Sequence, residues 1–381
     1  MLGQMQMTPD GRIRDKVETA IQRLKTFEPE EGYYVAFSGG KDSQCVYHLC
    51  KMAGVKFDAH YAVTSVDPPE LVRFIKKNYP DVKFERQHDK DGKPITMWNL
   101  IAANNIPPTR KVRYCCANLK EPGGVGRLTV TGVRWAESIN RKKTHDVVDF
   151  RGKKKGTIKL AEDIGAEYKL NKHGEVIMND DNDENRRMVE QCYRTRKTMI
   201  NPIVDWTNED VWGFLNENEI PHCNLYDEGF ERLGCIGCPL SGSRNMIRDF
   251  ERWPKYKTLY IHAFQRMIDN HPGKIRMLTD DTKYGIYDAQ REFEDSGILP
   301  VSEEMRGGVR TRYGNVLQVD QGKFVLMPSC GSGLTPMEIC RDGSCSGTWT
   351  EAAYSSENMF YWFTVGGENG TSRINPIKGD I

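Results

Sequence analysis

The strongest constraint on the fold is a glycine-rich turn between an apolar strand pattern and an apolar helix pattern, at residues 33–53. The central glycines let the backbone bend sharply and approach an anion without a Cβ in the way. Amide groups at a helix N-terminus also attract negative charge. We therefore expect the turn to hold phosphate groups through Ser38, Gly39, Gly40, Lys41, Asp42 and Ser43.

The turn is not a Walker phosphate loop. The pattern G-x-x-x-x-G-K-[ST] would need glycine at position 35 and serine or threonine at position 42, where the chain has Val35 and Asp42. An ordinary Gly-Gly turn with incidental charge is the alternative. The flanking strand and helix patterns favour the phosphate site.

Strand-like and helix-like segments alternate along the first third of the chain. Strands are expected at 33–37, 57–63, 82–86 and 127–133, and helices at 12–27, 42–53, 69–79 and 95–104. This alternation predicts an α/β fold with a doubly wound, mostly parallel, Rossmann-like sheet. Ligands of such sheets bind beyond the carboxyl ends of the strands. The turn at 38–43 and the segment from Gly132 to Arg141 both follow strand ends, so we expect them to share one crevice.

The expected domain organisation has three parts: an N-terminal helix in residues 1–30, a nucleotide-binding domain in 31–255, and a C-terminal extension in 256–381. Thr207 and Asp210 have the spacing of a capping box at a helix start. Further helices are expected at 243–252 and 255–270, followed by a hairpin of strands 313–319 and 323–327. The aromatic run at 360–363 is interpreted as packing.

Residues 142–196 interrupt the alternation and are interpreted as an insertion. A basic block precedes an acidic block around residues 180–184, and such blocks are usually solvated loops. The short apolar segments Thr157–Leu160 and Val176–Met178 predict a small β insertion. The alternative is a lid or polyanion-binding flap built on the basic residues from 141 to 155.

Composition limits the function classes. The formal net charge is only +1, so no global field favours nucleic acid, although a local patch would allow it. No apolar run is long enough to span a membrane, and the first residues lack a signal-peptide core, so we expect a cytoplasmic protein without a membrane partner. Eleven cysteines in such a chain favour metal or redox chemistry over disulfides.

The segment after the strand at 127–133 carries candidate anion ligands. Guanidinium groups bind phosphate or sulfate in bidentate fashion, which makes Arg134 and Arg141 candidates for catalysis and binding beside Lys41 and Asp42. Gly132 and Ser138 complete the candidate nucleotide site, and Glu137 would orient an arginine or bind a ribose hydroxyl. A structural ion pair is the alternative. Asp42 would bind Mg²⁺ if the substrate is a triphosphate.

Four cysteines form two pairs, each expected on a loop: Cys115-Cys116 and Cys235-x-x-Cys238. Such thiols suit an iron–sulfur cluster or a tetrahedral zinc, and unligated thiols are the alternative. Three cysteines near the C-terminus, Cys330, Cys340 and Cys345, lie in a Gly-rich region. They are candidates for a mobile nucleophile or a small metal site, against incidental thiols.

Three segments resemble one known group. The SGGKDS turn is similar to the pyrophosphate loop of the N-type ATP pyrophosphatases, within the adenine nucleotide α-hydrolase-like superfamily. Residues 131–141 resemble the motif T-G-x-R-x-x-E-S-x-x-R, and residues 201–238 resemble the end of the phosphoadenosine phosphosulfate (PAPS) reductase domain. The resemblance implies binding of ATP, PAPS or adenylyl sulfate. It also implies that the four paired cysteines hold a [4Fe–4S] cluster, as in adenylyl-sulfate reductases.

Two reactions fit this resemblance. The intact loop favours splitting ATP into an adenylate and pyrophosphate, with sulfur-related chemistry at the cluster. The alternative is thiol-dependent reduction of PAPS or adenylyl sulfate to sulfite, but the chain lacks the Glu-Cys-Gly-x-His segment of those reductases. Either reaction implies a partner protein that donates thiol electrons or sulfur. A third hypothesis is a binding module without turnover that uses the basic stretch 141–155.

Overall fold

The computed structural model describes residues 5–7, 13–109, 112–152, 154–195 and 197–271, the backbone of five strands between 301 and 340, and Phe363. The chain forms two compact units. The first comprises Met1–Val63, Asp67–Gln87 and Lys120–Gly234, and the second Thr64–Val66, His88–Leu119 and Cys235–Ile381. No helix among the described residues is both long enough and apolar enough to cross a membrane.

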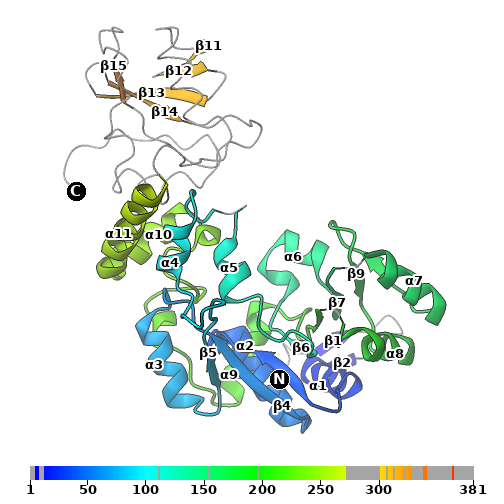
Figure 1. Cartoon of the computed structure of the whole chain (residues 1–381). Coiled ribbons are helices and arrows are strands. Elements are labelled where there is room, and N and C mark those ends of the chain that lie inside the picture. The colour runs from blue at the N-terminus through cyan, green and yellow to red at the C-terminus, as the bar shows by residue number, and fades with distance from the viewer. Residues whose placement is uncertain are drawn as a thin grey trace. The chain divides into compact units, whose positions relative to one another are not determined.

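The first unit is built on an eight-stranded sheet in the order β5-β4-β3-β6-β10-β7-β9-β8 (Figure 1). The neighbouring strands β5, β4, β3, β6 and β10 are parallel to one another. β7, β9 and β8 extend the sheet beyond β10, each antiparallel to its neighbour. The expected doubly wound, mostly parallel α/β fold is therefore confirmed. The strand bounds are β3 (Tyr33–Ala36), β4 (Phe57–Ala62), β5 (Lys83–Glu85), β6 (Thr129–Val130), β7 (Val148–Phe150), β8 (Lys169–Leu170), β9 (Val176–Met178) and β10 (Thr198–Ile200).

The strand order reverses between β3 and β6. The chain runs outward from β3 through β4 to β5, and then returns to place β6 on the other side of β3. Tyr34 pairs with Thr129 and Val35 with Val130, so the two strands end side by side. A reversal of this kind opens a crevice beyond the carboxyl ends of the strands, where ligands of such sheets bind.

Helices follow the strands as expected. α1 (Lys16–Thr26), α2 (Lys41–Ala53) and α9 (Asn208–Glu217) pack in sequence, α1 on α2 and α2 on α9, while α3 (Pro69–Asn78) connects β4 to β5. The expected helix at 12–27 starts later than predicted, because Ile13–Asp15 forms β2, paired with β1 (Met5–Met7). Asp15 ends this strand and caps α1 by accepting the amide of Val17 at 2.8 Å.

The prediction for residues 142–196 was wrong in part. Val176–Met178 is a strand as expected, but Thr157–Leu160 lies inside α7 (Lys154–Ile164). Its β-branched residues suggested a strand, whereas Thr157 and Ala161 have helical spacing and both are buried. The strands of this segment also join the main sheet instead of forming a separate β unit.

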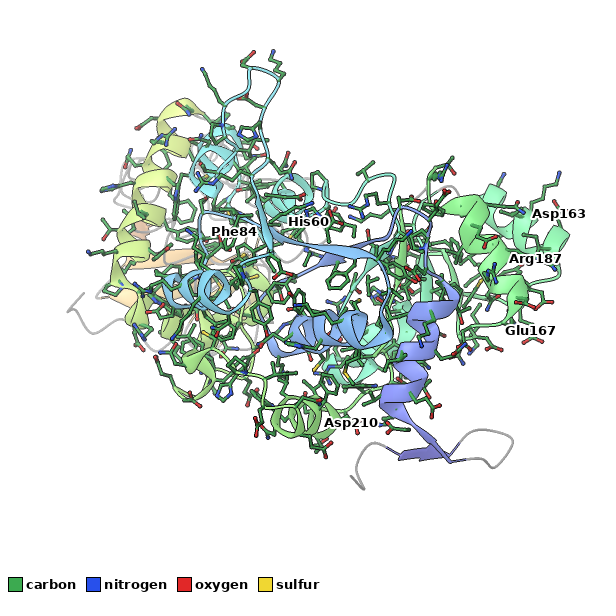
Figure 2. The ribbon with its side chains drawn as sticks, turned by 90° about the horizontal axis from the view of Figure 1, so that it is seen from below. His60, Phe84, Asp163, Glu167, Arg187 and Asp210 are labelled. Atoms are coloured by element: carbon green, nitrogen blue, oxygen red, sulfur yellow. The ribbon has the colours of Figure 1, made fainter. Side chains whose placement is uncertain are left out.

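The acidic block around 180–184 starts a helix instead of forming a loop. Asn182 caps α8 (Asp183–Cys192) by accepting the amide of Asn185 at 2.9 Å, and acidic side chains suit the positive end of a helix. The charges of α7 and α8 lie at the outer edge of the unit, where Asp163, Glu167 and Arg187 are exposed (Figure 2). The basic block before them spans α6 (Ile139–Thr144) and β7.

The second unit is helical where its side chains are described. It contains α4 (Met97–Ala103), α5 (Tyr114–Leu119), α10 (Ser243–Arg252) and α11 (Pro254–Asn270), and α11 packs on α4. Phe363 is buried against Phe250, Tyr260 and Phe264, which supports a packing role for this end of the aromatic run. Residues 360–362 lie outside the described residues.

Five antiparallel strands complete the second unit: β11 (Val301–Met305), β12 (Gly308–Thr311), β13 (Gly314–Asp320), β14 (Lys323–Met327) and β15 (Glu338–Cys340). β13 and β14 are the predicted hairpin. The helices expected at 243–252 and 255–270 are confirmed as α10 and α11.

The start of α9 is fixed by its own capping residues. Thr207 accepts the amide of Asp210 at 3.2 Å, and Asp210 accepts the amide of Thr207 at 2.7 Å, which confirms the expected capping box. Asp210, labelled on α9 in Figure 2, also pairs with Lys16 of α1. The neighbouring Trp206 is buried against Phe214, as expected for a packing residue.

Loss of the cap should destabilise the first unit. We expect Thr207→Ala to lower the free energy of unfolding by about 1 kcal/mol, because the amide of Asp210 loses its acceptor. Thr207→Ser keeps the hydroxyl and is the matched control. Chemical denaturation measures both, and equal destabilisation by the two variants would contradict the capping role.

Candidate functional site

The turn at 38–43 has the geometry that its glycines predicted. Gly39 has φ +72°, and a Cβ there would lie 2.6 Å from Cδ1 of Ile75. The turn closes on itself, because Ser43 Oγ accepts the Ser38 amide at 3.2 Å and donates to the Gly40 carbonyl at 2.8 Å. Gly40 is the N-cap of α2, so the turn presents the first amides of this helix.

Lys41 is held by a segment that sequence reasoning did not assign to the site. Its Nζ donates to the carbonyl of Glu231 at 3.1 Å and lies 3.7 Å from Asp42, while its amide donates to the hydroxyl of Tyr226 at 2.9 Å. Burial raises the pKa of Tyr226 well above its usual value, so its hydroxyl stays protonated near neutral pH. Tyr226 lies 185 residues from Lys41, and no local pattern indicates this contact.

Gly132 brings the turn after β6 against the start of α2. A Cβ at this position would lie 2.9 Å from the carbonyl carbon and oxygen of Asp42 and 3.1 Å from the amide of Ser43. Only a hydrogen atom fits there. The two sequence motifs therefore meet at the same end of β3 and β6, as expected from the strand order.

Arg134 contacts protein acceptors with its whole guanidinium group. Nε donates to Asp42 at 2.6 Å, and the other two nitrogens donate to the Trp206 carbonyl at 3.1 Å and to Asn208 at 2.9 Å. The residue is 1% exposed. This geometry presents no outward fork for phosphate. It makes Arg134 the residue that orients Asp42, which corresponds to the structural ion pair weighed as the alternative.

Glu137, Ser138 and Arg141 continue the site along the chain. Glu137 accepts the Arg134 amide at 3.1 Å, and its other oxygen lies 3.0 Å from Arg232 and 4.0 Å from Nε of Arg141. Glu137 therefore lies beside the side chains of two arginines. Ser138 caps α6 by accepting the amide of Arg141 at 3.2 Å, which is a structural role. The Arg141 side chain is 33% exposed, in contrast to Arg134.

The four paired cysteines lie together in the second unit as partly buried thiols. A hydrogen bond with Cys116, burial, and the nearby thiols of Cys235 and Cys238 all raise the pKa of Cys115. Contrary to expectation, Cys115 and Cys116 lie in the helix α5 and not on a loop. Among the described residues, no group of three or more His, Cys, Asp or Glu side chains is arranged so that it could hold a metal ion.

The Cys235–Cys238 turn is firmly held. Ile236 donates its amide to Val66 at 2.8 Å and accepts the hydroxyl of Tyr260 at 3.1 Å, while the Gly237 amide donates to Asp249 at 3.1 Å. Gly237 has φ +68°, and a Cβ there would lie 2.4 Å from the ring of Phe250. Such a fixed turn of small residues is typical of a CxxC half-site. Of the C-terminal cysteines, Cys330 and Cys345 lie outside the described residues, and Cys340 ends β15.

Comparisons with known proteins agree with the motifs. Residues 32–241 match the family model of the phosphoadenosine phosphosulfate reductase domain. An uncharacterized protein of Methanocaldococcus jannaschii is 26% identical over 242 residues, which cover 61% of this chain and 47% of that protein. An adenosine 5'-phosphosulfate reductase of Oceanobacillus iheyensis is 32% identical over 60 residues, 16% of this chain and 25% of the reductase.

Among solved structures, the phosphoadenylyl-sulfate reductase of Candida auris in complex with phosphate aligns with a TM-score of 0.30 at 12% identity. The alignment covers 61% of this chain and 98% of that protein. The chain spans about half the length of the longest-matching curated relatives, 47% and 48%.

The close approach at Gly132 generates a prediction. We expect Gly132→Ala to weaken the binding of inorganic pyrophosphate about a hundredfold, because the added methyl group displaces the backbone of Asp42 and with it the loop amides. Gly234→Ala is the control, since a Cβ at Gly234 meets nothing within 4 Å. Calorimetric titration measures the affinities. Unchanged affinity in a folded Gly132→Ala protein would contradict the role of this contact.

Proposed function

We propose that this chain, which belongs to the phosphoadenosine phosphosulfate reductase domain family through residues 32–241, binds an adenine nucleotide at the turn 38–43. We further propose that it splits ATP between the α- and β-phosphates. The position of the turn at the reversal of the strand order carries the proposal. The hydrogen bond from Arg134 to Asp42 within the turn supports it.

Each part of the turn has a proposed task. The amides of Gly40, Lys41 and Asp42 bind phosphate oxygens at the start of α2. Lys41 Nζ lies 3.1 Å from the Glu231 carbonyl and 3.7 Å from Asp42, and it contributes positive charge to the β- and γ-phosphates. Asp42, whose side chain is 23% exposed, would hold Mg²⁺, which would supply further positive charge to a bound triphosphate. Arg134 holds this carboxylate in one direction through its 2.6 Å hydrogen bond.

The proposed reaction is a displacement at phosphorus. A nucleophilic oxygen forms a bond to the α-phosphorus, and the bond from this phosphorus to the bridging oxygen breaks. The electron pair leaves on pyrophosphate, whose added charge Lys41 and the loop amides stabilise. With water as nucleophile the products are AMP and pyrophosphate, and the proton of water is released to solvent. Arg141 is proposed to bind the adenylate phosphate.

The four cysteines are proposed to hold a [4Fe–4S] cluster, with zinc as the alternative. The fit rests on the chemistry of the donors: four thiols gather in one unit, and one pair belongs to a rigid turn. When bound, such a cluster supplies electron transfer or sulfur handling. A partner protein that donates thiol electrons or sulfur is part of this proposal, as is a cytoplasmic location.

Reduction of PAPS or adenylyl sulfate to sulfite is the second candidate, favoured by the match to adenosine 5'-phosphosulfate reductases. Incubation of anaerobically purified protein with ATP and with PAPS separately distinguishes the candidates. Pyrophosphate and AMP from ATP support the proposed function, and thiol-dependent sulfite from PAPS supports the second. Nucleotide binding without either product would leave a binding module.

Lys41 tests the phosphate site. We expect Lys41→Ala to lower ATP turnover about a hundredfold or more, because the leaving pyrophosphate loses a full positive charge. Lys51→Ala removes an exposed lysine from the same helix and should leave turnover unchanged. A pyrophosphate-release assay compares the two. Full activity in Lys41→Ala would refute the assignment of the loop.

Iron content tests the cysteine site. Anaerobically purified protein should be brown and contain about four irons per chain, because four thiolates complete such a cluster. Cys235→Ser should lose the iron, whereas Cys50→Ser alters a thiol buried in α2, in the other unit, and should keep it. Metal analysis and absorption spectra measure both. Colourless protein with one zinc per chain would contradict the cluster.

A further inference from the structure

His145 has no role in the site described so far, yet it lies between Arg141 and a buried carboxylate. It follows α6 directly, and its backbone is fixed at two points. Its amide donates to the Arg141 carbonyl at 3.0 Å, and its carbonyl accepts Nε1 of Trp135 at 2.8 Å. The residue is 8% exposed. Its ring is therefore held in one place next to the motif that carries Arg141.

The ring contacts Asp149 through one nitrogen. His145 Nδ1 lies 2.5 Å from Oδ2 of Asp149, a residue of β7 that is 1% exposed. The same carboxylate accepts the Asp146 amide and the Nδ2 group of Asn201, each at 3.0 Å. An ionised carboxylate has no proton to donate and only accepts hydrogen bonds. Nδ1 of His145 therefore carries the proton and donates it.

The other nitrogen contacts Arg141. Nε2 of His145 lies 3.1 Å from a terminal nitrogen of Arg141. A guanidinium group donates hydrogen bonds and never accepts them, so Nε2 must be the acceptor. Both contacts require the same neutral tautomer, with its proton on Nδ1. Arg151 also approaches the ring, at 3.3 Å from Nδ1 and 3.4 Å from Nε2, and lies 4.0 Å from Asp149. It is paired with Glu175 at 2.6 Å.

We propose that Asp149 and His145 form a relay that positions Arg141 to bind the substrate's phosphate or sulfate group. A neutral imidazole holds the guanidinium group without cancelling its charge. A carboxylate at the same distance would neutralise it, as Asp42 does for Arg134. A third of the Arg141 side chain is exposed, and the carboxylate of Glu137 lies farther from it than the ring does, at 4.0 Å from Nε.

The benefit of such anchoring is a lower entropic cost of binding. An unrestrained arginine loses much of its rotamer freedom when it binds an anion, and pre-ordering removes this loss. His145 and Asp149 are therefore positioning residues. The inference rests on the proposed function in one respect, namely that Arg141 contacts the nucleotide.

The test uses two substitutions that differ in reach. His145→Asn can still donate to Asp149 but is too short to accept from Arg141. His145→Gln places its amide oxygen near the position of Nε2 and should restore the contact. We expect His145→Asn to raise Kd for AMP or KM for ATP about tenfold with kcat changed less, and His145→Gln to recover most of this loss. His88→Asn, at an exposed histidine, is the control.

A double-mutant cycle decides whether the effect passes through Arg141. If it does, His145→Asn adds nothing in an Arg141→Ala background. Full additivity, or equal weakening by His145→Asn and His145→Gln in folded proteins, would overturn the relay. Loss of binding in Lys41→Ala combined with no effect of either His145→Asn or Arg141→Ala would refute the relay and leave the proposed function in place. No effect of Lys41→Ala would refute the function itself.

Discussion

The ion pair between the buried guanidinium group of Arg134 and the partly exposed Asp42 connects the two turns of the candidate site. Asp42 lies in the first turn of α2 after β3, and Arg134 follows β6, so their 2.6 Å contact joins the ends of neighbouring strands where the strand order reverses. Removing one partner of such a pair leaves an uncompensated charge at a cost of about 3–5 kcal/mol. The close approach of Gly132 to the Asp42 backbone adds a steric condition. Together, charge and shape fix the loop before any ligand arrives.

The two arginines of the motif differ in a way that their spacing does not reveal. Arg134 is paired with a carboxylate and is 1% exposed, which suits it to hold protein groups in place. Arg141 lies 3.1 Å from the ring of His145 and 4.0 Å from Glu137, and a third of its side chain is exposed. Burial and the identity of the partner thus separate a supporting arginine from one that is proposed to bind an anion.

Much of the fold was predictable because its signals are local. The alternation of apolar segments predicted the parallel sheet, and the glycines of the 38–43 turn predicted its backbone. The strand order also predicted that the turn 38–43 and Gly132 meet, but the partners of most individual groups in the site were not predictable. The partner of the Lys41 amide is Tyr226, and no pattern connects residues so far apart. The Thr157–Leu160 segment was misassigned because its β-branched residues favour a strand locally, whereas burial along one helical face determines its structure. The domain boundaries and the roles of the individual site residues remain predictions.

The central claim is that the turn at 38–43 binds the phosphates of a nucleotide at the β3–β6 reversal. A crystal structure of the protein with Mg²⁺ and an ATP analogue that has a methylene group between the α- and β-phosphates tests it most directly. The account predicts phosphate oxygens within hydrogen-bond distance of the amides of Gly40, Lys41 and Asp42, with the guanidinium of Arg141 on the α-phosphate. A nucleotide bound elsewhere, with this turn facing solvent, would contradict it.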